Sequence, residues 1–276
     1  MDAARHVDQL FATLQRGDQE LMIVAAHPDD DVIGAGALMS RISRVRVVYA
    51  TDGAPRDGGD ARAHGFADVA AYAAARQREA RAALALAGVG ADRVACLGVP
   101  DQQATFALQQ LAGSIAELTR AHAPAVVLTH AYEGGHPDHD ATAFAVHAAL
   151  ELVRRAPVPP PAPTLVEFAG YHIGPDGGRD TGFLPGGLPA LEIELDERER
   201  RLKRAMFTCH PSQAAVLAWF AVERERFRLA ARYDFTRAPH EGALLYERPG
   251  SGAEWGIDGA RWRQEAAAAR RRLLGD

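Results

Sequence analysis

Several features that mark particular classes of protein are scarce in this sequence. It contains two cysteines, Cys96 and Cys209, in 276 residues, too few for a framework of disulfide bonds or a four-thiolate zinc site. No uninterrupted apolar run reaches the roughly 18 residues that a membrane-spanning helix requires. The first eight residues include two acids and lead into no apolar core, so we expect no secretory signal. These absences favour a soluble, cytoplasmic protein without a membrane span.

An excess of positive charge is also missing. Lysine and arginine total 31 against 36 aspartates and glutamates, which gives a net charge of -5. Such a chain is not drawn to a polyanion, so we expect no nucleic-acid partner. With 47% hydrophobic and 24% charged residues, it can bury a substantial core. Histidine is the informative residue, because several of the 11 histidines stand beside carboxylates.

The first half of the chain alternates between two patterns. Continuous apolar runs are typical of parallel strands that are covered on both faces, and between them lie segments with helical spacing or high helix propensity. This alternation predicts a Rossmann-like α/β sandwich of three layers, with a mostly parallel central sheet and helices on both faces. The expected strands are 21–26, 45–51, 94–97 and 125–129, and the expected helices are 5–17, 32–41, 68–87, 108–122 and 139–154.

A proline-rich stretch at 157–163 interrupts this alternation, and we interpret it as a surface loop. The rest of the chain has no separate core signature, so residues 1–276 are expected to form a single domain that ends in a terminal helix and tail at 260–276. Residues 54–65 are expected to form a loop. Further strands are expected at 164–171, 191–195 and 243–247, and further helices at 196–209 and 213–230.

Two short segments carry most of the chemistry. Residues 26–31 read Ala-His-Pro-Asp-Asp-Asp, and residues 135–140 read Gly-His-Pro-Asp-His-Asp. Each follows an apolar strand and opens a helix. Because ligands bind at the carboxyl ends of strands in open α/β sheets, the two segments converge on one crevice if their strands are near neighbours.

These segments offer the donors of a catalytic metal site. Two imidazoles and one carboxylate around an open fourth position form a catalytic zinc site, and donors without thiolate also tolerate other divalent metals. One carboxylate and one histidine would remain for proton transfer. This set of metal donors and proton-transfer groups matches metal-assisted hydrolysis.

A purely structural interpretation competes with this one. Acids at the start of a helix often act as caps, worth about 0.3–1 kcal/mol each, and His-Pro often begins a turn. Two such segments, each after a strand, weaken that interpretation.

The glycines on either side of Ala35 resemble part of a dinucleotide-binding motif, but the third glycine of that motif is missing. These small residues therefore predict close packing of a helix on the sheet instead.

The two motifs, His27-Pro28-Asp29-Asp30 and His136-Pro137-Asp138-His139, resemble the signatures of the PIG-L/LmbE-like zinc-dependent N-deacetylases. That family acts on N-acetylglucosaminyl conjugates. The resemblance extends over about residues 20–215. It also includes Thr51-Asp52-Gly53, Arg76-x-x-Glu79, Lys203 and His210-Pro211-Ser212-Gln213.

The resemblance implies roles for five residues of the two motifs. It implies that His27, Asp30 and His139 are zinc ligands. It implies that Asp29 is the general base for a metal-bound water. His136 would stabilise the oxyanion or protonate the leaving amine.

Weaker correspondences concern residues around this cluster. Arg76, Asp101 and His210 are similar to substrate-contacting positions, although each also has an ordinary structural explanation. Asp138 would orient His136 or another imidazole, or would cap a helix. Tyr132 lies near a family tyrosine, but two glycines separate it from the second motif.

The resemblance therefore implies a hydrolase with one Zn²⁺ per chain that removes an N-acetyl group from an amino sugar or glycoconjugate. Two alternatives stay open, a non-catalytic relative that binds metal or sugar and a divalent-metal phosphoesterase. Asp29 argues against the first, and the shortage of basic residues near the motifs argues against the second. The sequence identifies neither the individual sugar nor the oligomeric state, and an oligomer is compatible with it.

Overall fold

The computed structural model describes residues 3–250 and 252–275. Within them, a seven-stranded sheet has the strand order β3-β2-β1-β4-β5-β9-β8. The first five strands of this order are parallel, whereas β9 runs antiparallel to both β5 and β8. The strands are β1 Leu21–Ala25, β2 Val45–Pro55, β3 Val94–Asp101, β4 Val126–His130, β5 Thr164–Phe168, β8 Leu191–Glu194 and β9 Arg224–Leu229, and a small hairpin comprises β6 His172–Ile173 and β7 Arg179–Asp180.

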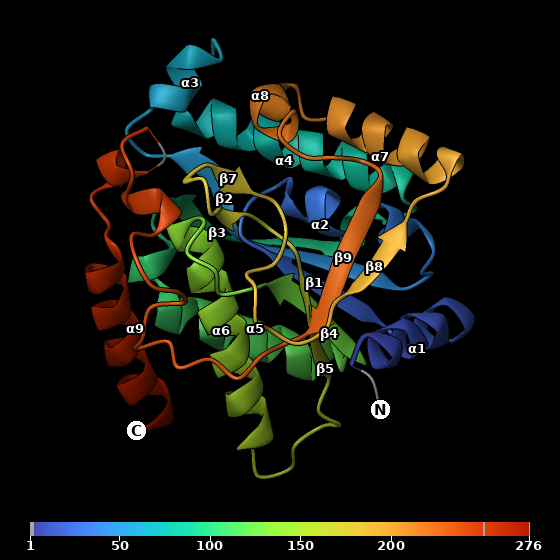
Figure 1. Cartoon of the computed structure of the whole chain (residues 1–276). Coiled ribbons are helices and arrows are strands. Elements are labelled where there is room, and N and C mark those ends of the chain that lie inside the picture. Colours follow the sequence, from blue (N-terminus) through green and yellow to red (C-terminus); the bar gives the residue numbers. More distant parts are fainter. Residues whose placement is uncertain (1–2, 251, 276) are drawn as a thin grey trace.

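Helices cover both faces of the sheet (Figure 1). Helices α1, α2, α4 and α7 contribute to one hydrophobic core, and α5, α6 and α9 contribute to the other. This arrangement confirms the predicted three-layer α/β sandwich. The helices are α1 Ala3–Arg16, α2 Asp30–Ser40, α3 Gly59–Ala63, α4 Val69–Leu86, α5 Leu108–His122, α6 Pro137–Arg154, α7 Glu197–Thr208, α8 Ala214–Leu217 and α9 Gly259–Leu274.

Strand β1 lies inside the sheet, between β2 and β4. Its side chains alternate between the two cores. Leu21, Ile23 and Ala25 face one core, whereas Met22 and Val24 face the other, and all five are fully buried. Because β1 and β4 are neighbours, the loops that follow them meet at the same edge of the sheet.

The expected helix at 213–230 is wrong. Only α8 and a preceding short 3-10 helix are helical there, and the chain then forms β9. The charged residues of this segment favour an exposed helix locally, but the fold supplies them with buried partners. The Arg228 Nε donates to Glu167 Oε2 at 2.7 Å, and Glu225 pairs with Lys203. Tertiary ion pairs therefore override local propensity.

Two smaller expectations are also wrong. Leu245–Glu247 is a 3-10 helix rather than part of a strand. Its apolar side chains are buried, and the Leu245 amide donates to the Gly134 carbonyl, so burial rather than strand pairing explains the apolar run. The stretch 54–65 contains the end of β2 and the single turn of α3, which is too short for a clear periodic signal.

The proline-rich residues 157–163 form the connection between α6 and β5, and most of them are exposed, as expected for a surface loop. Helix α9 packs against α6, and the Trp262 indole donates to the Pro137 carbonyl oxygen at 3.1 Å. This contact ties the terminal helix to the start of α6. In the part of the chain that the structure describes, no helix has the length and apolar character needed to cross a membrane.

Helix α2 follows the first acid–histidine segment and contains a break. Ala35 has non-helical dihedral angles (φ -146°, ψ 21°). The Glu225 carboxylate accepts the Ala37 and Leu38 amides beyond the break, at 2.8 and 3.0 Å. Lys203 donates to Glu225 at 2.9 Å and to the Ile33 carbonyl at 2.8 Å. Two buried side chains thus replace the backbone bonds that the break removes.

Close packing of α2 on the sheet, as predicted from its small residues, is confirmed at Gly34. A Cβ on Gly34 would lie 2.3 Å from the Phe168 ring of β5. Lys203, the only lysine in the sequence, is fully buried beside this helix. The Lys203–Glu225 pair and Gly34 together fix the helix that begins with Asp30.

We predict that Glu225→Gln destabilises the protein by about 3–5 kcal/mol, because it leaves the buried Lys203 without a charged partner. Urea unfolding monitored by circular dichroism measures the change in the free energy of unfolding. Glu223→Gln is the matched control, because Glu223 is exposed two residues away. Equal stability of the two variants would contradict the role given to the pair.

Candidate active site and metal centre

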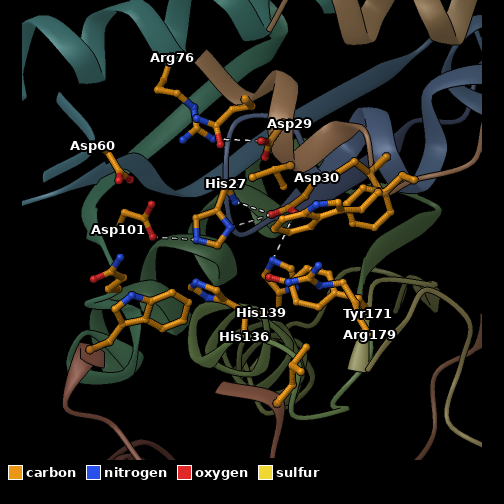
Figure 2. Close-up of a pocket in the computed structure, with 18 of the residues that line it drawn as sticks. His27, Asp29, Asp30, Asp60, Arg76, Asp101, His136, His139, Tyr171 and Arg179 are labelled. Atoms are coloured by element: carbon orange, nitrogen blue, oxygen red, sulfur yellow. Dashed lines mark hydrogen bonds and ion pairs between the residues drawn. The ribbon is translucent and has the colours of Figure 1, made fainter. Parts of the chain in front are cut away.

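A pocket of about 200 Å³ lies at the carboxyl edge of the parallel strands. The two acid–histidine segments meet in it. His27, Asp29 and Asp30 enter from the end of β1 and the start of α2, and His136 and His139 enter from the start of α6 (Figure 2). Residues more than a hundred positions apart in the sequence therefore share one cavity.

His27 and Asp30 are tied together within the first segment. The backbone amide of His27 donates to Asp30 Oδ2 at 2.7 Å, and the His27 Nδ1 atom lies 3.1 Å from the same oxygen. Both side chains are almost completely buried. The turn between β1 and α2 thus presents one imidazole nitrogen and one carboxylate to the same point.

Asp30 connects this segment to the second one. Its Oδ1 atom lies 3.2 Å from His139 Nε2. The ligand nitrogens of His27 and His139 lie within 4.8 Å of each other. Ligand atoms around one tetrahedral zinc ion are about 3.4 Å apart, so the distance between Asp30 and His139 is that of two ligands of one ion.

The other nitrogen of His27 faces two further carboxylates. Its Nε2 atom lies 3.1 Å from Asp101 Oδ1 and 3.4 Å from Asp138 Oδ2. Burial lowers the pKa of His27, but Asp101 and Asp30 outweigh it and raise the pKa well above its usual value. The carboxylates therefore favour positive charge at this position. A carboxylate that accepts the second N–H of an imidazole also orients it as a metal ligand.

Asp138 also fixes the loop after β3. Its carboxylate accepts the Gln102 amide at 2.6 Å and the Ala104 amide at 3.1 Å. Gln102 has a positive φ of 67°, a conformation that is unfavourable for a residue with a side chain. The bonds to Asp138 offset this cost and place the adjacent Asp101 beside His27. The imidazole that the Asp138 carboxylate faces is His27, whereas only the Asp138 backbone amide contacts His136.

His136 occupies the N-cap position of α6. Its Nδ1 atom accepts the Asp138 backbone amide at 3.1 Å, so the proton of the neutral ring is on Nε2. Burial, together with His27 and His139, lowers the pKa of His136 well below its usual value. His136 is therefore a neutral imidazole with an N–H group to donate in the pocket.

Asp29 is held from the other side of the pocket. The Arg76 guanidinium lies 3.2 Å from Asp29 Oδ2 and donates to the Gly53 carbonyl at 2.8 Å. Burial raises the pKa of Asp29, and Arg76 opposes that shift. A Cβ on Gly53 would lie 2.9 Å from the Arg76 guanidinium carbon, so the glycine makes room for this contact.

His130 is a site residue that our sequence analysis missed. It is the last residue of β4, and its ring stacks on that of His139 with the centroids 4.1 Å apart. The Ala26 amide donates to His130 Nε2, which lies 3.4 Å from Asp30 Oδ2. A histidine that ends an apolar strand just before the second motif was the signal that could have identified it.

Hydrogen bonds distinguish metal ligands from supporting imidazoles. Among the described residues, possible ligand groups include His27 with His136 and His139, and Asp30 with His130 and His139. His130 and His136 each use one ring nitrogen to accept a backbone amide and therefore carry a proton on the other. We infer that His27 Nδ1, Asp30 and His139 Nε2 are the atoms suited to hold a metal ion.

A family model described as GlcNAc-PI de-N-acetylase matches residues 22–150, slightly less than half of the chain. This range contains both acid–histidine segments and the strands that carry them. Residues 22–150 are therefore similar to the PIG-L family. A search of curated proteins finds no match to the sequence.

Solved structures with the fold of the PIG-L domain include two deacetylases. The A40926 pseudoaglycone deacetylase Dbv21 is 20% identical over 78% of this chain and 100% of its own, with a TM-score of 0.57. The N,N'-diacetylchitobiose deacetylase of Pyrococcus horikoshii is 16% identical over 82% of this chain and 91% of its own, also with a TM-score of 0.57.

The same fold occurs in a protein with another activity. GalB, the 4-carboxy-2-hydroxymuconate hydratase of Pseudomonas putida KT2440, is 17% identical over 82% of this chain and 100% of its own, with a TM-score of 0.56. At these identities the likeness establishes the fold. The reaction has to be argued from the site.

The tyrosine of the pocket lies outside the PIG-L family match. Tyr132 is buried on the Trp262 ring, and its hydroxyl donates to the Arg237 carbonyl rather than into the pocket. Tyr171 lines the pocket instead. A Cβ on Gly135 would lie 1.8 Å from the Tyr171 carbonyl oxygen, so this glycine permits the approach of the segment that carries Tyr171.

The remaining candidate, His210, is fully buried and is not among the described residues that line the pocket. Burial, with a smaller contribution from Arg76, lowers the pKa of His210 to about 3. Arg76 and Asp101 do line the pocket, although Arg76 is already engaged with Asp29 and Gly53.

We predict that Asp138→Ala accelerates hydrogen exchange of the Gln102 and Ala104 amides by about tenfold or more, because losing a buried acceptor costs about 1–3 kcal/mol. Hydrogen exchange measured by mass spectrometry over residues 101–106 tests this. Asp52→Ala is the control, because Asp52 accepts the Ala54 amide in a different loop. Unchanged exchange at 101–106 in Asp138→Ala would contradict the anchoring role.

Proposed function

We propose that this protein is a metal-dependent hydrolase that removes the N-acetyl group from an amino sugar or a sugar conjugate. The observation that carries the proposal is the convergence of His27, Asp30 and His139, with Asp29 and His136 beside them. The description of the matching family and the names of the deacetylases that share the fold support the same reaction.

The donor set fits a zinc ion. Two imidazole nitrogens and one carboxylate leave a position open for water or substrate, as in catalytic rather than structural zinc sites. The same donors also accept other divalent first-row metals. The ion would lower the pKa of a bound water and polarise the acyl oxygen of the substrate. His27, Asp30 and His139 are proposed to hold it.

Asp29 is the proposed general base. Its carboxylate lines the pocket next to Asp30 but takes no part in the contacts between His27, Asp30 and His139. Because burial raises the pKa of Asp29, the carboxylate is a better proton acceptor than an exposed aspartate. Arg76 holds one oxygen of Asp29, which leaves the other oxygen to accept the proton of the attacking water.

His136 is proposed to stabilise negative charge on the acyl oxygen. With Nδ1 occupied by the Asp138 amide, its Nε2–H group is a fixed donor. Donors that are oriented before the reaction stabilise developing charge most effectively. Asp29, once protonated, can pass its proton to the leaving amine, so this one side chain covers both proton transfers.

The pocket is poorly suited to a phosphoester. Five of its lining residues are acidic, and two arginines oppose them: Asp29, Asp30, Asp60, Asp101 and Glu254 against Arg76 and Arg179. Arg76 is already paired with Asp29. Even with a divalent ion bound, this lining offers few cationic side chains to pair with the oxygens of a phosphate, whereas a neutral N-acetyl sugar needs none. The charge balance therefore favours amide hydrolysis over phosphoryl chemistry.

We predict that Asp29→Asn lowers kcat by about 10²- to 10⁴-fold while zinc stays bound, because the variant loses the proton acceptor and keeps the three donors. Release of acetate from N-acetylglucosamine conjugates measures the rate, and atomic absorption measures zinc. Asp31→Asn is the control for loss of a neighbouring buried carboxylate, since its side chain pairs with Tyr49. Full turnover in Asp29→Asn would exclude Asp29 as the base.

We predict that His139→Ala loses bound zinc, whereas His136→Gln keeps about one zinc per chain and loses activity. Of these two histidines, only His139 is proposed to bind the ion, because His136 Nδ1 accepts a backbone amide and its Nε2 carries the proton. Metal content after equilibrium dialysis distinguishes the two variants. A His139→Ala protein with full zinc content, or a His136→Gln protein without zinc, would contradict the ligand assignment.

A further inference from the structure

The pocket has two sides of different chemistry, which lie on either side of the acid–histidine cluster. In Figure 2, Asp60 and Asp101 are on the left of the cluster, and Tyr171 and Arg179 are on the right. Carboxylates are suitable acceptors for the hydroxyl groups of a sugar. The side of Tyr171 and Arg179 instead presents aromatic rings and a guanidinium.

Rings and one guanidinium form a column on this second side, in which Tyr171 meets His139 edge to face and Arg179 lies over the rings of Tyr171 and Trp219. The Tyr171 ring lies 5.1 Å from the ring of His139. The Arg179 guanidinium carbon lies 5.4 Å from the centroid of Tyr171 and 3.5 Å from that of Trp219. The column therefore extends from a proposed metal ligand to an indole at the pocket mouth.

Trp219 is an exposed apolar surface in a fixed position. It lines the pocket, yet 46% of its surface remains exposed. Arg179 stacks on its ring, and no ion pair of Arg179 with a carboxylate is found among the described residues. An ordered aromatic surface binds a flat ring without the usual loss of side-chain entropy.

The surroundings of Trp219 distinguish between a second sugar and an aromatic ring. Val216 and Phe220, which line the pocket next to Trp219, have no side-chain hydrogen-bonding groups. The Gln213 amide is occupied, because it donates to the Tyr72 hydroxyl and the Ser212 carbonyl at 2.8 and 2.7 Å. Val216, Trp219 and Phe220 therefore form an apolar surface that a flat ring would cover, whereas a second sugar would find a hydrogen-bond donor here only in Arg179, whose Nε has no partner.

The column lies outside the part of the chain that matches the PIG-L family model. Tyr171, Arg179 and Trp219 follow residue 150, where the match ends. The acid–histidine cluster lies within the match. The aromatic side is therefore not part of the region that matches the family model.

We propose that the substrate is an N-acetyl amino-sugar glycoside with an aromatic aglycone, which stacks on Trp219 while the sugar faces Asp60 and Asp101. This proposal rests on the proposed function and specifies its substrate class. Stacking of one aromatic pair contributes about 0.5–1.5 kcal/mol beyond the area that it buries, so the aglycone should change kcat/KM measurably.

The test compares the zinc-loaded enzyme on three glycosides of N-acetylglucosamine, namely the phenyl β-glycoside, the methyl β-glycoside and N,N'-diacetylchitobiose. Acetate release gives kcat/KM for each. The phenyl glycoside should exceed both others by at least about fivefold. Equal values for the phenyl and methyl glycosides, or a preference for the disaccharide, would overturn the proposal.

Variants of Trp219 and Arg179 test whether these residues cause the preference for the phenyl glycoside. In Trp219→Ala the ratio of kcat/KM between phenyl and methyl glycosides should fall close to one, and in Arg179→Gln it should fall to an intermediate value. Phe106→Ala is the matched control, because Phe106 is 50% exposed, lies near an arginine and does not line the pocket. An unchanged ratio in Trp219→Ala would overturn the proposal.

A binding measurement separates this proposal from the proposed function. Calorimetric titration of the Asp29→Asn protein with the phenyl glycoside should give a dissociation constant that Trp219→Ala raises at least about fivefold. One outcome is that binding depends on Trp219 but the unsubstituted enzyme releases acetate from none of the glycosides. This outcome would contradict the proposed deacetylase activity and support the aromatic site. Acetate release without a phenyl preference would contradict the aromatic site alone.

Discussion

The contact between Asp30 and His139 joins the two halves of the candidate site, and the remaining geometry depends on it. It exists because β1 and β4 are adjacent parallel strands, although a hundred residues separate them. The strand order reverses its direction between these two strands, which is where open α/β sheets place their ligand crevice. The topology therefore brings together two segments, each of which alone supplies only part of the proposed ligand set.

Burial of charge explains why the cluster needs its many partners. Asp29, Asp30 and Asp138 are almost completely buried, and an isolated buried carboxylate is strongly unfavourable. Arg76 compensates Asp29, two backbone amides compensate Asp138, and imidazoles surround Asp30. A divalent cation beside Asp30 would complete this balance. The fold by itself does not decide the reaction, since a hydratase shares it.

Local signals in the sequence predicted the parts of the molecule that depend on local chemistry. Apolar runs identified β1 to β4, and the two motifs identified the residues that meet in the pocket. Strand β9 was missed because its charges are stabilised by Lys203 and Glu167, which no local pattern reveals. Tyr171 and Trp219 were missed for a related reason. They come from separate loops, and only the packing against Gly135 and Arg179 brings them to the pocket.

The central claim is that one divalent ion sits between His27 Nδ1, Asp30 and His139 Nε2. Anomalous diffraction at the zinc edge from crystals of the zinc-loaded protein tests it most directly. The account predicts a single strong peak about 2.0–2.2 Å from these three ligands, with His136 and His130 uncoordinated. A peak bound by His136 or His130, or one between Asp101 and Asp138, would contradict it.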